Sequence, residues 1–252
     1  MHAVMHGFLL ALQFLSRLPV PVECPWNADT SRWAVRCYPL VGLLLGGIVA
    51  LAGLLLQATL PTPMLALLLL SAWVALSGGL HLDGWMDVAD AVGSNAPLEK
   101  RWAIMKDPHV GSFGILALVF LLLWKGALLL ALLDAGIGLA WLPLVVALAR
   151  LGAVVLLVLA PAARPAGLAW VWKQYLGKHD LLWSLVPLAI GFLLWPGWPW
   201  LLVALAPFLI GYGLWARRAF NGINGDIVGA AIEGGELWLL LSVWLWYSFA
   251  TG

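Results

Sequence analysis

The chain has 252 residues, of which 63% are hydrophobic and only 10% are charged, and its mean hydropathy is +0.99. A soluble globular domain carries about a quarter charged residues, so this composition excludes one and predicts a polytopic integral membrane protein. The formal net charge of +1, without any basic run, gives no indication of nucleic-acid binding.

The first hydrophobic segment, over residues 1–19, is too short to cross a bilayer. It has no Lys or Arg before its apolar run and no small-residue cleavage site, so it does not fit a signal peptide. We therefore predict a retained interfacial or re-entrant helix that ends at Pro19.

The rest of the chain contains about seven apolar segments of the roughly twenty residues that a bilayer requires. Polar loops over residues 84–111 and 161–180 interrupt them, and a tight PGWP turn over residues 196–199 joins the fifth to the sixth. We expect an all-α fold: a polytopic membrane helical bundle of about seven transmembrane helices plus the N-terminal helix, in a single domain over residues 1–252. The predicted spans cover residues 38–60, 64–82, 113–133, 140–159, 181–195 and 200–215, and a last run that ends at residue 249.

The basic residues predict the orientation of the bundle. All Lys and Arg except Lys125 and Arg150 fall in four segments, which alternate with three connections that contain neither residue. By the positive-inside rule the four segments are cytoplasmic and the C-terminus is outside. We therefore expect a protein of the bacterial inner membrane. The four segments are residues 17–36, the two polar loops, and Arg217–Arg218.

Two acidic motifs lie at the cytoplasmic ends of these spans. The first, GLHLDGWMDVAD over residues 79–90, places Asp83, Asp87 and Asp90 at i, i+4 and i+7, which is one stripe of a helix. Three carboxylates on one stripe repel one another, so a cation is expected among them. Magnesium is favoured, because it prefers a few carboxylates together with phosphate oxygens of a substrate.

The second motif, NGINGDIVGAAIEGGE over residues 221–236, places Asp226, Glu233 and Glu236 roughly on one helix face. In the alternative interpretation, Asp83 and Asp226 cap helices and the other acids face water. Two acidic clusters on the same side of a protein with so few charges favour the functional interpretation.

Several other residues are candidates on chemical grounds. His81 is either a ligand or proton carrier, or an interfacial anchor. Lys106 and Asp107 combine a phosphate-seeking ammonium with an acid, or form a solvated loop pair. Lys125 and Arg150 lie inside spans, which favours an inward role toward phosphate or a carboxylate over snorkelling.

At these residues the chain resembles the cobalamin synthase family, the adenosylcobinamide-GDP ribazoletransferases. The combination of HLDGxxDxxD with a downstream GDxxGAxxExxE is specific, and the matching segments occur in the family's order over nearly the whole chain. The chain departs from the family at Pro108 and His109, where Ser and Arg are common, and at Asn224, where Thr is common. The matching segments are FLLALQFLSRLPVP, YPLVGLLLGG, GGLHLDGWMDVADAV, IMKDPHVGSFGILAL and NGINGDIVGAAIEGGELWLLL.

The resemblance implies a membrane transferase in the last steps of vitamin B12 (cobalamin) biosynthesis. The enzyme would join adenosylcobinamide-GDP to α-ribazole or α-ribazole 5'-phosphate, with Mg²⁺, and release GMP. A homo-oligomer and association with other late enzymes of the pathway are compatible with it. The implied metal ligands are Asp83, Asp87, Asp90, Asp226, Glu233 and Glu236. The catalytic candidates are Asp83, Asp87, Asp90 and His81, and the substrate-binding candidates are Lys106, Asp107, Arg17, Asn224 and Arg150.

Two other classes of protein use acids in membrane helices. A CDP-alcohol phosphotransferase has Ala-Arg shortly after its Asp-Gly pair, which this chain lacks after Gly84. A divalent-cation transporter would need acids near mid-membrane on a through-path, whereas both clusters here are predicted at the ends of spans. Neither alternative matches the full order of motifs.

Overall fold

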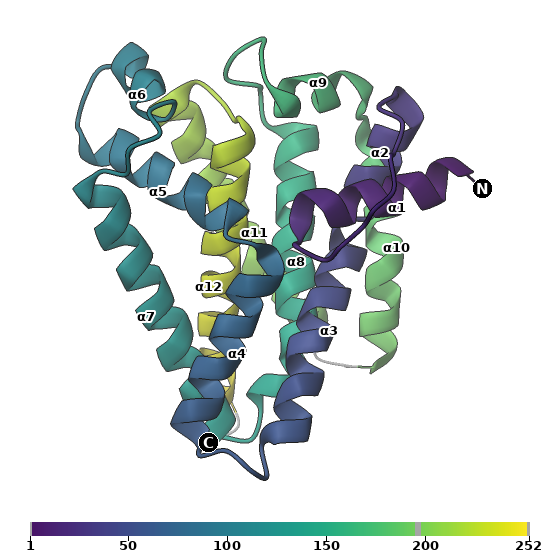
Figure 1. Cartoon of the computed structure of the whole chain (residues 1–252), viewed down its shortest axis with the longest axis vertical. Helices are drawn as coiled ribbons and strands as arrows, with labels where there is room; N and C mark the ends of the chain where they lie inside the picture. The colour runs from purple at the N-terminus through teal and green to yellow at the C-terminus, as the bar shows by residue number, and fades with distance from the viewer. Residues whose placement is uncertain (1, 195–197, 251–252) are drawn as a thin grey trace.

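The computed structural model describes residues 2–194 and 198–250, in which twelve helices are joined by turns and loops and one isolated β-bridge pairs Ala162 with Ile223 (Figure 1). The described residues contain no β-strand, as the composition predicts. The helices are α1 (His2–Leu15), α2 (Ala28–Arg36), α3 (Tyr38–Leu56), α4 (Thr62–Ser77), α5 (Leu80–Gly93), α6 (Leu98–Ile104), α7 (Ser112–Asp134), α8 (Gly138–Leu159), α9 (Leu168–Tyr175), α10 (Lys178–Leu194), α11 (Trp198–Phe220) and α12 (Gly225–Ala250).

The number of membrane spans is five or six over the described residues. The helices α3, α7, α8, α11 and α12 are each long and apolar enough to cross a bilayer, and α4 with α5 would add one broken span. This confirms a polytopic membrane helical bundle. The predicted span over 181–195 corresponds to α10, which has 17 residues. Residues 195–197, which include the start of the predicted PGWP turn, lie outside the described residues.

Five short helices gather at one end of the bundle. Figure 1 shows α1, α2, α5, α6 and α9 at the upper end of the long helices, together with the α11–α12 connection. The α3–α4 and α7–α8 connections lie at the lower end. The four segments rich in Lys and Arg therefore share one end, as their alternation along the chain predicts.

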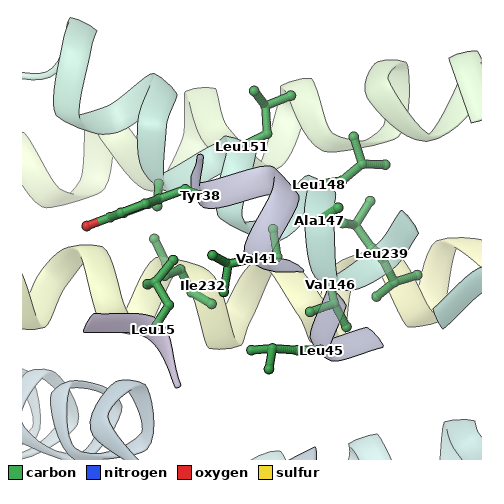
Figure 2. Close-up of a cluster of buried hydrophobic side chains, with 14 of the residues drawn as sticks. Leu15, Tyr38, Val41, Leu45, Val146, Ala147, Leu148, Leu151, Ile232 and Leu239 are labelled. Carbon is green, nitrogen blue, oxygen red and sulfur yellow. The ribbon is translucent and has the colours of Figure 1, made fainter. Parts of the chain in front are cut away.

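The centre of the bundle is α8, which packs closely against α3. A Cβ on Gly42 would lie 2.5 Å from the Cα of Ala147, and one on Gly46 would lie 2.7 Å from the carbonyl oxygen of Leu142. These two glycines let the backbones approach directly, as small residues do in membrane helix pairs. Figure 2 shows the apolar side chains of α3, α8 and α12 that fill the space around this contact.

The chain bends sharply where α4 meets α5. Gly78 and Gly79 both have left-handed backbone angles, with φ of +72° and +73°, which glycine adopts without strain. The two helices consequently lie at 90° to one another. The predicted span over 64–82 is thus interrupted after Ser77, and α5 runs across the end of the bundle (Figure 1).

The N-terminal helix also lies across this end. It ends at Leu15, four residues before the predicted end at Pro19, and the backbone N–H of Arg17 then donates to the carbonyl of Leu76 (2.8 Å). This bond fixes the segment that follows α1 to the last turn of α4. The transverse placement agrees with an interfacial helix that does not cross the bilayer.

Candidate functional site

The two acidic motifs meet where α5 crosses the start of α12. A Cβ on Gly84 would lie 2.7 Å from the carbonyl oxygen and 2.9 Å from the Cα of Asp226. No side chain fits between the two backbones at this position. The contact brings Asp226 of the second motif beside Asp83 and Asp87 of the first, as the shared orientation of the motifs predicts.

Asp83, Asp87 and Asp226 form a cluster of acids without basic partners. Asp83 is exposed, whereas Asp87 and Asp226 are half-buried. Within the described residues, no Lys, Arg or His lies within ion-pair distance of the three carboxylates. Burial, followed by the charges of Asp83, Asp226 and Asp90, raises the pKa of Asp87 to about 7. The cluster therefore lacks a cation that would let all its members ionise.

Asp90, the last acid of the first motif, has a structural partner. Its two carboxylate oxygens accept hydrogen bonds from the backbone N–H groups of Gly111 (2.7 Å) and Gly114 (2.8 Å), at the start of α7. The carboxylate caps this helix from another element and satisfies two of its otherwise free N–H groups. A Cβ on either glycine would collide with the carboxylate. Asp90 is thus a helix cap, a role that the alternative interpretation gave to Asp83 and Asp226, and its predicted metal role stays a prediction.

Asn224 positions Asp226. Its side-chain oxygen accepts the backbone N–H of Ile227 (2.9 Å), which is an N-cap for α12, and its amide nitrogen donates to the carboxylate of Asp226 (2.8 Å). The preceding residue, Ile223, forms the isolated β-bridge with Ala162 through two backbone bonds of 2.9 Å. A contact between Asn224 and a substrate stays a prediction.

The donor set of the acid cluster suits a hard divalent cation. Carboxylate oxygens are the ligands that magnesium prefers, and magnesium is usually held by one or two carboxylates with the remaining positions left to water and substrate phosphate. Among the residues that the structure describes, no three His, Cys, Asp or Glu side chains are placed to hold one metal ion by themselves. A site completed by substrate phosphate is consistent with that spacing.

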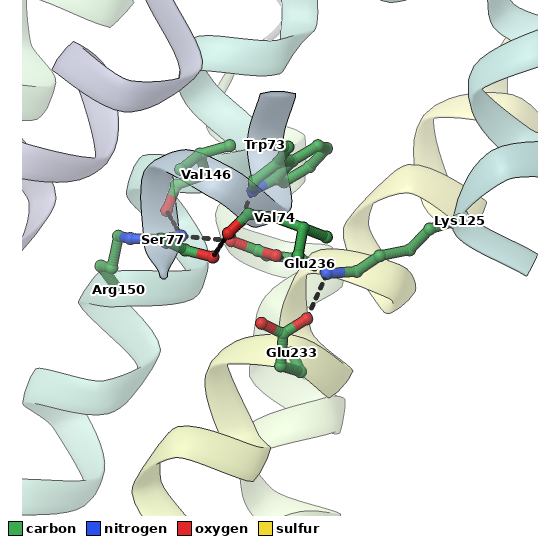
Figure 3. A network of polar contacts seen from close by, with 8 residues as sticks. All are labelled: Trp73, Val74, Ser77, Lys125, Val146, Arg150, Glu233 and Glu236. Carbon is green, nitrogen blue, oxygen red and sulfur yellow. Dashed lines mark hydrogen bonds and ion pairs between the residues drawn. The ribbon is translucent and has the colours of Figure 1, made fainter. Parts of the chain in front are cut away.

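The two glutamates of the second motif belong to a separate buried ion network (Figure 3). Lys125 of α7 donates to Glu233 and to Glu236, at 2.5 Å each, and Arg150 of α8 donates to Glu236. The indole N–H of Trp73 also donates to Glu236 (3.3 Å), and the Lys125 ammonium lies 5.0 Å from the centre of that ring. The two positive charges of Lys125 and Arg150 thus balance two negative charges on the glutamates inside the bundle.

This network confirms the prediction that Lys125 and Arg150 face inward toward a carboxylate. Arg150 has no exposed surface and Glu236 is 1% exposed, so ionic partners are required to offset the desolvation of each charge. Because Glu233 and Glu236 have these partners, they need no metal for neutralisation. The metal role of the two glutamates and a contact between Arg150 and substrate stay predictions.

His81 links the acid cluster to this network. Its side chain is 4% exposed, it packs against Gly229 of α12, and its Nε2 has no hydrogen-bond partner among the described residues. Burial, and then the positive charge of Arg150, lower the pKa of His81 to about 3. The ring is consequently neutral near pH 7.

The other substrate-binding candidates lie at the same end of the molecule. The aliphatic part of Arg17 lies against Gly78 at the α4–α5 bend, and the residue is exposed. Lys106 and Asp107 are exposed after α6, and Asp107 accepts the backbone N–H (3.0 Å) of His109 and contacts its ring nitrogen (2.7 Å). Hydrogen bonds from His109 lower the pKa of Asp107. The structure places these residues around the site without joining them to the acid cluster.

A cavity of about 240 Å³ adjoins Asp226 and His81. Its wall includes Phe14 of α1 and Trp172 of α9, residues that the motif analysis did not single out. The sequence contains 17 Trp, and nothing in their spacing distinguishes those that line a cavity from those that anchor at an interface.

Comparison with known proteins gives concordant matches. A family model described as cobalamin-5-phosphate synthase matches residues 7–244. An adenosylcobinamide-GDP ribazoletransferase of Halalkalibacterium halodurans is 38% identical over 256 residues, which is 98% of each chain. The enzyme with the same name from Pseudomonas aeruginosa PAO1 is 41% identical, and the match covers 96% of this chain and 99% of that enzyme. The one from Pseudomonas putida GB-1 is 42% identical, and the match covers 94% of this chain and 97% of that enzyme. No solved structure matches.

Proposed function

The chain belongs to the cobalamin-5-phosphate synthase family, a family of transferases in cobalamin synthesis, and from this premise we propose that it is a magnesium-dependent adenosylcobinamide-GDP ribazoletransferase. The family assignment rests on matches that cover nearly the whole length of this chain. The structural observation that supports the proposal is the cluster of Asp83, Asp87 and Asp226, whose carboxylates lack a cation partner.

The proposed reaction is a phosphoryl-group substitution. The 3'-hydroxyl oxygen of α-ribazole, or of its 5'-phosphate, forms a bond to the phosphorus on the cobinamide side of the diphosphate. The bond between that phosphorus and the bridging oxygen breaks, and GMP leaves with the bridging oxygen. The products are adenosylcobalamin, or its 5'-phosphate, and GMP.

One or two carboxylates of the cluster formed by Asp83, Asp87 and Asp226 would hold the magnesium ion together with phosphate oxygens of the substrate, with Asp90 on the same helix. When bound, the ion neutralises charge on the attacked diphosphate and on the departing GMP. We propose that a carboxylate of this cluster accepts the proton of the attacking hydroxyl, because the cluster is open to water while the ring of His81 is enclosed.

The basic residues around the cluster suit anionic substrates. Arg17 lies against the bend at the start of α5, and Lys106 is exposed in the loop that follows α6. An exposed guanidinium and an exposed ammonium bind phosphate oxygens by charge-assisted hydrogen bonds. We propose that they orient the guanosine diphosphate end, and that this face of the protein is the cytoplasmic face of a bacterial inner membrane.

The direct test uses purified protein in detergent with adenosylcobinamide-GDP and α-ribazole, with and without magnesium. We expect a cobalamin product and GMP, both detected by mass, in the presence of magnesium, and their loss after addition of a chelator. If the folded protein forms no product and instead conducts divalent cations in liposomes, the acid cluster is a transport site and the proposed transferase activity is wrong.

A further inference from the structure

The cavity beside Asp226 has the composition of a site for a flat, largely apolar ring. Three aromatic side chains surround it, from α1, α3 and α9: Phe14, Tyr38 and Trp172. The Trp172 ring meets Phe14 edge-on, with ring centres 4.9 Å apart, and Tyr38 edge-on at 6.1 Å. Aromatic walls of this kind stack on nucleobase-like rings independently of the polar groups at the ring edges.

Polar groups in the wall are few. Among the described residues that line the cavity, only His81 carries a basic side chain and only Asp226 a carboxylate, and Asp226 also belongs to the acid cluster. Nε2 of His81 and Nε1 of Trp172 are buried without hydrogen-bond partners among the described residues. Both nitrogens belong to residues that line the cavity, and buried polar atoms are ordinarily paired, so the two side chains have an unused hydrogen-bonding capacity beside it.

The apolar lining discriminates among the heteroaromatic bases of the proposed substrates. Guanine, and the adenine of the adenosyl group, carry several donors and acceptors at their edges, and most of these would lose their hydrogen bonds to water in this cavity without replacement. The benzimidazole-type base of a ribazole has only one free ring nitrogen, because the other carries the ribose. Such a base leaves a single acceptor to be satisfied.

We propose that the cavity binds the heteroaromatic base of the ribazole, with the ring against Trp172 and Phe14 and its free nitrogen toward the unpaired nitrogens of the wall. The ribose then lies at the Asp226 side, next to the acids at which its hydroxyl reacts. This inference rests on the proposed function, because it names the site of one of the proposed substrates.

The test is a Trp172→Leu variant, which removes the aromatic wall and keeps an apolar side chain. We expect the KM for α-ribazole to rise about tenfold, the value expected for loss of one base–aromatic stack. The KM for adenosylcobinamide-GDP should stay the same, and kcat should change little. A Trp172→Phe variant, which keeps an aromatic ring, should restore the KM for α-ribazole to within about twofold of the wild-type value.

Trp200→Leu is the matched control. Trp200 also has a buried, unpaired indole nitrogen among the described residues, but it stacks on Trp246 in another part of the bundle, with ring centres 4.9 Å apart. This variant should leave both KM values unchanged. An unchanged KM for α-ribazole in Trp172→Leu, or a rise confined to adenosylcobinamide-GDP, overturns the assignment of the cavity.

Two measurements on the wild-type protein decide the question without a variant. Free benzimidazole should inhibit competitively against α-ribazole and not against adenosylcobinamide-GDP; competition with the latter overturns the inference. Calorimetric titration with α-ribazole alone should show binding that benzimidazole displaces, and absence of this binding overturns the inference even if turnover is normal. If α-ribazole binds in this way but no product forms, the assignment of the cavity holds and the proposed reaction is wrong.

Discussion

Asp83 is the most exposed carboxylate of the acid cluster and has no hydrogen-bond or ion-pair partner within the described ranges. Its replacement therefore removes charge from the site without breaking a structural contact. We predict that Asp83→Asn lowers kcat by at least about 10²-fold, comparable to loss of a single electrostatic group from an active site. Product formation measured by mass, on protein that elutes from size exclusion as wild type does, checks this.

Asp134→Asn is the control for this change. Asp134 is exposed at the opposite end of α7, so the same loss of one carboxylate should leave turnover unchanged. Near-normal turnover of Asp83→Asn would contradict the assignment of the acid cluster.

Glu236 is the shared member of the buried network, with contacts to Lys125, Arg150 and Trp73. Glu236→Gln leaves the two cations with one carboxylate in a site without water access. We predict a loss of about 3–5 kcal/mol in stability, as for removal of one partner from a buried ion pair. A lower thermal unfolding midpoint in detergent, compared with the exposed control Glu99→Gln, is the expected readout; equal midpoints would show that the network does not stabilise the fold.

For individual residues, the sequence indicates which charged side chains need a partner better than it indicates which residue that partner is. Lys125 and Arg150 are predicted to face inward toward phosphate or a carboxylate, because isolated charges inside spans are unfavourable. The acids they bind, Glu233 and Glu236, were instead grouped with the metal site, since helical spacing alone gives no helix rotation relative to neighbours. The capping role of Asp90 was not predicted for the same reason: the N–H groups it binds belong to another helix.

At the scale of elements, the contact between α5 and α12 depends on Gly84. Its missing Cβ would lie 2.7 Å from the backbone oxygen of Asp226, and backbone cannot move aside as a flexible side chain can. We predict that Gly84→Ala separates the two helices and lowers kcat by about tenfold or more, because sub-ångström placement of reacting groups is lost. Turnover compared with Gly47→Ala, a helical glycine with nothing within 4 Å of its Cβ position, checks this.

The Gly47→Ala control should keep full activity and gain slightly in stability, by about 0.5–1 kcal/mol, as alanine does over glycine within a helix. If Gly84→Ala is as active as this control, the close approach of α5 and α12 is not required for the reaction.

The sequence predicts most of the helices and the gathering of the charged connections at one end, but not the bend between α4 and α5. Apolar residues continue through Leu82, so hydropathy extends the span past Ser77. The Gly78–Gly79 pair is a turn signal, yet glycine is also frequent inside transmembrane helices, so composition does not distinguish a bend from a continuous helix.

For the molecule as a whole, the gathering of the charged connections at one end predicts opposite accessibility of its two faces. The native cysteines, Cys24 and Cys37, are buried. We predict that in spheroplasts Glu99→Cys, on α6, is shielded from a membrane-impermeant maleimide, while Asp134→Cys, at the other end, is labelled. Disruption of the membrane should expose Glu99→Cys, and the reverse pattern would contradict a cytoplasmic site.

The right-angle bend at Gly78–Gly79 also determines the direction from which a large substrate arrives. Since α5 lies at 90° to α4 and runs across the end of the bundle (Figure 1), the acids that it carries lie at this end of the molecule. A corrinoid far larger than the 240 Å³ cavity can stay at the water interface, with only its diphosphate arm directed at the protein. Search along this surface takes place in two dimensions, so retention of substrates at the membrane would shorten the time between encounters.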